Sequence, residues 1–157
     1  MPKRDLPKRA YEDFPPGLEL TLGPRHVTRD EIVAFAAEFD PQPMHLDEEA
    51  GRRSMLGGLA GSGWHTCCLM MRLIADEMLA QSTSMGSPGV EEIKWIAPLR
   101  PDSDITVKAT VTGARRSRSR PEMGLVNFRY DVHDQHGTHI MAVTSTMMLG
   151  TRESQPA

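Results

Sequence analysis

The residues best suited to chemistry are a carboxylate and an imidazole in one short stretch, Asp40-Pro-Gln-Pro-Met-His45. The two prolines restrict the backbone between Asp40 and His45, so the side chains can face one another with little conformational entropy to lose. A carboxylate and a histidine that both reach one water molecule can act as an acid/base pair. Short motifs also arise by chance, so the alternative of a helix-end aspartate and a hydrogen-bonded loop histidine stays open.

A second candidate is the stretch Gly61-Ser62-Gly63, which directly precedes the most apolar segment of the chain. If a helix begins there, Ser62 is a natural N-cap and the first backbone N–H groups lack helical acceptors. Such N–H groups, at the positive end of the helix dipole, suit an oxygen that gains negative charge. Glycine and serine also cap helices without any catalytic role. Combined with the Asp40 and His45 pair, however, the site has what conjugate addition of water to an unsaturated thioester requires.

The elements that must position these residues can be read from hydrophobic periodicity. A strand is predicted near residues 18–22, where leucines alternate with other residues. Thr28 and Glu31 have the spacing of a capping box, and the apolar residues from Ile32 to Phe39 recur at helical spacing, which predicts one apolar stripe. Asp40 should end this helix because a residue before proline is pushed out of the helical region. The segment 40–50 is then expected to be a loop.

The rest of the chain predicts one central helix and four strands. Residues 64–79 are apolar in nearly all directions around a helix, which is typical of a buried helix about 24 Å long. Strands are expected at 90–99, 105–111, 126–132 and 140–148, separated by turn residues. This order predicts an α+β fold in which an antiparallel sheet wraps around the central helix.

Composition limits the class of protein. A chain of 157 residues with 39% hydrophobic and 25% charged residues fits one globular domain. We expect a flexible leader at 1–16, the domain at 17–150 and a tail at 151–157. The net charge of −3 gives no reason to expect nucleic acid as a partner, and no apolar stretch is long enough to predict a membrane span. Two adjacent cysteines form no disulfide framework, which favours a cytoplasmic location.

The stretches 40–47 and 57–63 resemble the signature of the MaoC-like acyl dehydratases, the (R)-specific enoyl-CoA hydratase group. The stretches 95–102 and 117–121 resemble the strand that opens the second half of that family and its following connection. The resemblance covers roughly residues 17–150. Two positions depart from the family pattern, because Gln42 stands where the family has asparagine and Ser62 where it has histidine.

The resemblance implies a hot-dog fold, a homodimer or higher homo-oligomer, and interconversion of trans-2-enoyl-CoA and (R)-3-hydroxyacyl-CoA. It places the catalytic pair on Asp40 and His45 and the oxyanion hole on the backbone N–H of Gly63, without deciding which side chain is the acid. The neighbouring residues expected to bind the substrate are Gln42, Ser62 and Trp64. Coenzyme A enters as part of the acyl-CoA substrate, and neither another cofactor nor a metal is expected.

Two other functions stay open. A hot-dog thioesterase would use the same oxyanion site to hydrolyse acyl-CoA, and a non-catalytic module would bind acyl-CoA without turnover. Three further clusters are interpreted as structural: an exposed basic run, a histidine triplet at a hairpin turn, and a pair of buried apolar thiols. Their members are Arg115, Arg116, Arg118 and Arg120; His133, His136 and His139; and Cys67 and Cys68.

Overall fold

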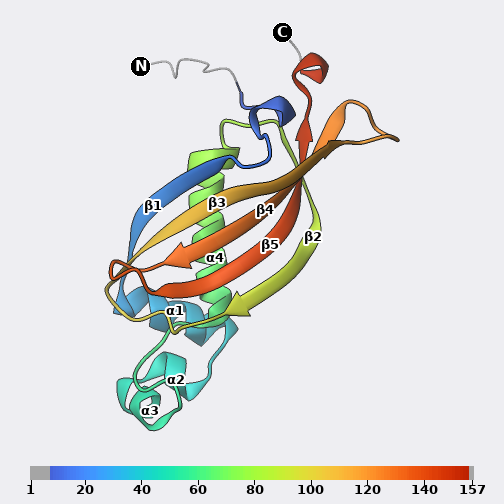
Figure 1. Ribbon diagram of the computed structural model, residues 1–157. Helices are drawn as coiled ribbons and strands as arrows, with labels where there is room; N and C mark the ends of the chain where they lie inside the picture. Colours follow the sequence, from blue (N-terminus) through green and yellow to red (C-terminus); the bar gives the residue numbers. More distant parts are fainter. Residues whose placement is uncertain (1–7, 156–157) are drawn as a thin grey trace, which may run out of the picture.

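The computed structural model describes residues 8–155, and its main feature is one antiparallel sheet curved around one helix (Figure 1). The strands lie in the order β1-β3-β4-β5-β2. Their bounds are Glu19–Val27 for β1, Ser84–Trp95 for β2, Ser103–Arg116 for β3, Met123–His133 for β4 and His139–Gly150 for β5. The helices are α1 (Arg29–Phe39), α2 (Pro43–Leu46), α3 (Glu48–Arg53) and α4 (Gly63–Ile74), and α4 continues as a π-helical segment, Ala75–Leu79. The predicted α+β hot-dog arrangement is confirmed.

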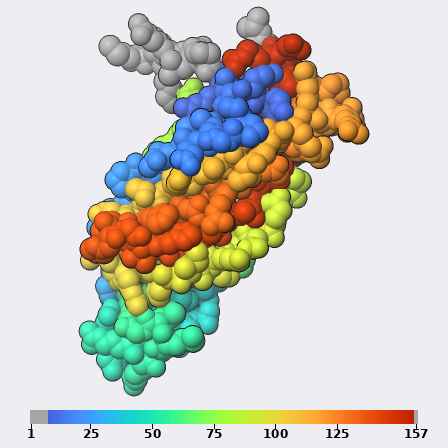
Figure 2. Space-filling view, viewed as in Figure 1, coloured from blue at the N-terminus to red at the C-terminus, as the bar shows by residue number. Residues whose placement is uncertain are grey.

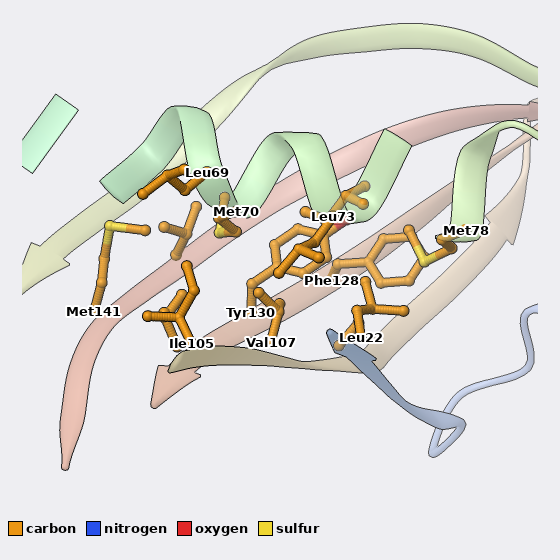
Figure 3. Close-up of a cluster of buried hydrophobic side chains, with 14 of the residues drawn as sticks. Leu22, Leu69, Met70, Leu73, Met78, Ile105, Val107, Phe128, Tyr130 and Met141 are labelled. Carbon is orange, nitrogen blue, oxygen red and sulfur yellow. The ribbon is translucent and has the colours of Figure 1, made fainter. Parts of the chain in front are cut away.

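The core lies between the inner face of the sheet and α4 (Figure 3). Successive side chains of a strand point to opposite faces, so alternate residues of β3 and β4 are buried. In Figure 3 the labelled sheet residues Ile105, Val107 and Tyr130 face Met70 and Leu73 of α4. Each such side chain contributes about 1.5–3 kcal/mol when fully buried. The alternation predicted for these two strands is therefore the pattern that builds the core.

The central helix is less completely buried than its composition predicts. Its sheet-facing residues are covered, whereas Trp64, Cys68 and Met71 are exposed in the single chain. The expectation of burial on all sides is wrong because the sheet of one chain covers only one side of α4. Cys67 is half-buried, with its Sγ 3.6 Å from Sδ of Met141, so only one of the two thiols faces the core.

Helix α1 begins as predicted, at a capping box. Thr28 Oγ1 accepts a 3.1 Å hydrogen bond from the Glu31 N–H, and Glu31 Oε2 accepts a 2.8 Å bond from the Thr28 N–H. The helix ends at Asp40, its C-cap, in front of Pro41. Phe39, expected on the apolar stripe, is 66% exposed. The stripe that packs against the core is therefore one turn shorter than the sequence indicates.

The segment expected to be a loop contains two short helices instead. Pro43 is the first residue of α2. Proline is favoured at this position because an N–H there would have no acceptor within the helix, so its absence costs no hydrogen bond. The Asp47 side chain caps α3 by accepting a 2.8 Å bond from the Ala50 N–H. Figure 1 shows α2 and α3 beyond the end of the sheet, and Figure 2 shows this segment as a protrusion of the molecular surface. His45 is thereby carried on a helix rather than on a loop.

The ends of the chain also differ from expectation. The segment expected to be a flexible leader includes residues 1–7, which lie outside the described residues. Its second half packs against the body: Phe14 is fully buried and contacts Phe128 edge-on, with ring centroids 5.8 Å apart. Near the other end, Arg152 donates a 2.6 Å bond to Asp13.

Strand β2 begins at Ser84, six residues before the predicted start. Within 8–155, no helix combines the length and apolar character needed to cross a membrane.

Candidate active site

The structure brings the predicted acid/base pair together. Asp40 ends α1 and His45 lies one helix later, in α2, with Asp40 Oδ2 3.5 Å from His45 Nε2. His45 is only 7% exposed, whereas the Asp40 carboxylate is partly accessible. A separation of 3.5 Å is longer than a direct hydrogen bond but leaves both groups within reach of one water molecule.

A backbone carbonyl fixes the other side of the His45 ring. His45 Nδ1 lies 2.6 Å from the carbonyl oxygen of Ala60. A carbonyl can only accept, so Nδ1 must carry the proton, and in the neutral ring Nε2 keeps its lone pair. The imidazole therefore presents a proton acceptor on the side that faces Asp40.

Two side chains hold the carboxylate of Asp40 in its charged form. Ser62 Oγ donates to Oδ2 at 2.6 Å, and Gln42 Nε2 donates to Oδ1 at 2.7 Å. These bonds, Ser62 first and Gln42 second, lower the pKa of Asp40 below its usual 3.8 against the opposing effect of burial, and His45 lowers it further. Asp40 is therefore a carboxylate at neutral pH. Although Gln42 is one methylene longer than asparagine, its amide reaches the carboxylate.

The beginning of α4 supplies the third part of the site. Ser62 is the N-cap, and its Oγ accepts a 3.3 Å bond from the Trp64 N–H while it donates to Asp40. Gly63 is the first helical residue, so its N–H has no acceptor within the helix and lies at the positive end of the helix dipole. A Cβ at Gly63 would lie 2.5 Å from the indole of Trp95. Glycine is required here because the indole of this tryptophan occupies the space that a Cβ would need.

These residues surround a cavity of about 510 Å³. Two tryptophans, Trp64 and Trp95, form an edge-to-face pair on its wall, with ring centroids 5.2 Å apart. The lining residues are Asp40, Gln42, His45, Met55, Leu56, Ala60, Gly61, Gly63, Trp64, Thr66, Trp95, Ile96, Ala97, Pro98 and Leu99. The lining is thus mostly apolar, and among its polar side chains Asp40 contacts both Gln42 and His45.

The structure separates the residues expected to bind substrate. Gln42 and Trp64 line the cavity, but Ser62 is fully buried and its hydroxyl is directed to Asp40. The expected contact of Ser62 with substrate is therefore replaced by a contact with the carboxylate. Trp95 was missed as a site residue, because strand periodicity gives no sign that the end of β2 meets the start of α4. Aromatic residues make up only 5% of the chain, and this scarcity was a signal that could have drawn attention to Trp95.

The clusters interpreted as structural lie away from this cavity. The four arginines at 115–120 are exposed. His133 stacks on His139, with ring centroids 4.7 Å apart, while His136 is exposed in the turn. Among residues 8–155, no group of three or more histidine, cysteine or acidic side chains is arranged to hold a metal ion.

Comparison with known proteins identifies the family of this chain. The model of the MaoC-like domain matches residues 14–132, more than half of the chain. The protein therefore belongs to the MaoC-like dehydratase and hydratase family. YdeM of Bacillus subtilis (strain 168), an uncharacterized protein, is 28% identical over 109 residues, which are 69% of this chain and 76% of YdeM.

Solved structures agree with this assignment. The MaoC-like dehydratase from Rhodospirillum rubrum has a TM-score of 0.82 and 36% identity, covering 91% of this chain and 97% of that one. The (R)-hydratase from A. caviae involved in PHA biosynthesis has a TM-score of 0.72 and 18% identity, covering 88% of this chain and 98% of that one. At that identity the second likeness concerns the fold alone.

Proposed function

We propose that the protein is a hydro-lyase that adds water to trans-2-enoyl-CoA to give (R)-3-hydroxyacyl-CoA, and catalyses the reverse elimination. The observation that carries this proposal is the orientation of His45. The Ala60 carbonyl holds its Nδ1 proton, so that Nε2 faces Oδ2 of Asp40 at 3.5 Å, beside the N-terminus of α4. Membership of the MaoC-like family supports the reaction class.

In the proposed hydration, a water molecule lies between Asp40 and His45. As its oxygen bonds to the β-carbon, His45 Nε2 takes one of its protons, because Nε2 has an unused lone pair whereas both carboxylate oxygens of Asp40 already accept hydrogen bonds. The electron pair of the carbon–carbon double bond moves toward the thioester carbonyl, which becomes an enolate oxygen. The backbone N–H of Gly63 and the helix dipole stabilise this negative charge.

The second step returns the proton. The imidazolium of His45 gives its Nε2 proton to the α-carbon, the enolate collapses to the thioester, and the net change is addition of one water. Asp40 keeps its charge throughout, since Ser62 and Gln42 hold its pKa low, and it stabilises the imidazolium between the two steps. Its carboxylate thus orients the water and the ring, while His45 carries the proton.

The test is loss of enoyl absorbance with crotonyl-CoA and a series of longer trans-2-enoyl-CoAs. We expect the wild type to hydrate at least one of them without releasing thiol, and Asp40→Asn and His45→Ala to lower kcat by about 10²–10⁴-fold. Asp47→Asn is the matched control, because Asp47 caps α3 in the same segment and its amide can still accept from Ala50. Thiol release would identify a thioesterase, and binding without turnover a non-catalytic module.

We also propose that the protein acts as a homodimer joined through β2. This strand is at the edge of the sheet, and almost all of its 12 residues are exposed in the single chain. A long exposed edge strand is a template for pairing with another chain. Val90, 55% exposed, lies on it, and Trp64 and Met71 of α4 are exposed as well.

The mass in solution tests the dimer. We expect sedimentation velocity to give twice the 17.4 kDa of one chain. Val90→Lys should weaken the association because it places a charge on the edge, whereas Thr112→Lys, on an exposed position of β3, should leave it intact. A wild-type monomer at micromolar concentration would refute the dimer.

A further inference from the structure

Arg100 makes a set of contacts that the proposed mechanism does not use. It follows the end of β2, is half-buried, and directs its guanidinium at backbone carbonyls: Nη2 donates to the Leu56 oxygen, and Nη1 to the Leu59 oxygen at 3.3 Å. No carboxylate of the described chain lies within ion-pair distance of it, although the neighbouring acidic residues Glu48 and Glu49 pair with Arg52. The guanidinium of Arg100 is therefore half-buried and bonded to backbone carbonyls instead of a carboxylate.

The carbonyls belong to the segment 56–61, which leads from α3 to α4. This segment has no regular structure, and Gly57 adopts a φ of +69°, which side chains rarely tolerate. Its other bonds include Gly61 N–H to the Leu99 oxygen at 2.8 Å, Leu56 N–H to Ser54 Oγ at 3.1 Å and the contact of the Ala60 oxygen with His45. Charge-assisted bonds are stronger than neutral ones, so the Arg100 side chain is a principal restraint on the segment.

The same segment supplies the acceptor for the His45 ring. Ala60, the residue directly after Leu59, carries the carbonyl that lies 2.6 Å from His45 Nδ1. The Ala60 oxygen belongs to the Ala60–Gly61 peptide, which directly follows the peptide whose Leu59 oxygen Arg100 holds, so a shift of the chain at Leu59 would move it as well. Arg100 itself does not line the cavity, so it reaches the reaction only through the segment.

We propose that Arg100 is a positioning residue: by holding the carbonyls of Leu56 and Leu59, it fixes the Ala60 carbonyl and thereby the Nδ1–H tautomer of His45. Its effect on catalysis rests on the proposed function, but its effect on the tautomer does not. An imidazole without such an acceptor exchanges between its two neutral forms, and in one of them Nε2 carries the proton and is no longer a base.

The experiment is NMR of the imidazole nitrogens and carbons of the full chain, with the His45 signals assigned by their loss in His45→Gln. With the ring in its neutral form, the wild type should show the Nδ1–H tautomer alone. Arg100→Met keeps the apolar stem but removes every donor, and should give a mixture of the two tautomers. Arg100→Lys, in which one ammonium replaces the two-pronged guanidinium, should change in the same direction by less.

Two controls make the result specific. Arg52→Met removes an arginine of α3 whose side chain is 64% exposed, and should leave the tautomer unchanged. In the activity assay, Arg100→Met should lower kcat by about 10–100-fold with little change in KM, because the base is misplaced rather than the substrate lost.

A pure Nδ1–H form in both folded Arg100 variants would overturn the proposal, whether or not the protein hydrates an enoyl-CoA. A raised KM with unchanged kcat would also overturn it, because that result would indicate direct contact between Arg100 and the substrate. A wild type that turns over no enoyl-CoA but shows the expected tautomer shift would refute the proposed function and leave the role of Arg100 standing.

Discussion

Ser62 Oγ donates a 2.6 Å hydrogen bond to Oδ2 of Asp40, across 22 positions of sequence. The bond joins the N-cap of α4 to the C-cap of α1, so the two helix ends that form the site are attached to each other. The same hydroxyl accepts from the N–H of Trp64. One side chain therefore both begins the central helix and keeps the carboxylate ionised, at the position where Ser62 departs from the histidine of the family pattern.

Ser62→Ala should remove both effects, and a control is needed to separate them. The Ser62 bond is the largest cause of the lowered pKa of Asp40, so its loss should raise that pKa. Activity that needs the carboxylate is lost as pH falls through the pKa, and the acid limb of the kcat/KM profile should therefore move to higher pH. Loss of the N-cap should also lower the free energy of unfolding by about 1 kcal/mol.

Thr28→Ala is the matched control for Ser62→Ala. Thr28 caps α1 in the same way but does not contact Asp40. It should reduce the stability by a similar amount, measured by urea unfolding, and leave the pH profile of kcat/KM in place. An acid limb that does not move in Ser62→Ala would show that this bond does not set the ionisation of Asp40.

Gln42→Leu should move the acid limb in the same direction by less. The Gln42 amide donates to Oδ1 at 2.7 Å and is the second cause of the lowered pKa of Asp40, after Ser62. Gln42 is exposed and caps no helix through its side chain, so the free energy of unfolding should stay within about 0.5 kcal/mol of the wild type. A shift larger than that of Ser62→Ala would reverse the assigned order.

Much of the fold could be predicted from the sequence because the sequence patterns that determine it are local. The alternation of β3 and β4, the capping box at Thr28 and the proline after Asp40 each act within a few residues and agree with the structure. The exposure of Met71 could not be predicted from the sequence, because burial on a central helix depends on how far the sheet curves around that helix. Composition describes a helix surface without saying which part of it is covered.

The site was predictable only in part, for the same reason. Asp40 and His45 are five residues apart, and their approach follows from one short segment. The contact of Trp95 with Gly63 joins positions 32 residues apart, and the bond of Arg100 to Leu59 joins positions 41 apart. Such contacts depend on which strand end lies beside which helix start, and periodicity carries no information on that.

Gly63→Ala should disable the site sterically. Helix propensity alone would favour alanine by about 1 kcal/mol. A Cβ at Gly63 would, however, lie 2.5 Å from the Trp95 indole, and overpacking of this kind costs about 1–3 kcal/mol. The steric cost should exceed the gain in helix propensity, so the free energy of unfolding should be lower than in the wild type. The kcat/KM should fall by about 10²–10³-fold because the backbone N–H at position 63 is displaced.

Trp95→Ala provides the test of that explanation. In this background the added Cβ has space, so Gly63→Ala should cost less stability than it does in the wild type. A double-mutant cycle of unfolding free energies measures the difference. Equal costs in the two backgrounds would show that glycine is needed at this position for a reason other than the indole.

His65 should make the stability depend on pH below about 6.5. Its ring is 6% exposed and stacks on Phe35, with centroids 4.6 Å apart, and within the described chain its Nδ1 has no hydrogen-bond partner. Burial lowers the pKa of His65 below its usual 6.5, although Glu31 opposes this and Arg25 reinforces it. The unfolded chain therefore binds a proton that the folded chain does not, and the free energy of unfolding should fall as pH decreases below about 6.5.

His65→Phe removes this titration while keeping a ring to stack on Phe35. Urea unfolding at pH 7.5, 6.5 and 5.5 should show a smaller loss of stability on acidification in the variant than in the wild type. His26 has the opposite effect, since Asp104 raises its pKa, but it is present in both proteins and cancels in the difference. His136→Asn, at an exposed turn, should match the wild type. Parallel pH dependences for His65→Phe and the wild type would mean that burial of the imidazole does not control its protonation.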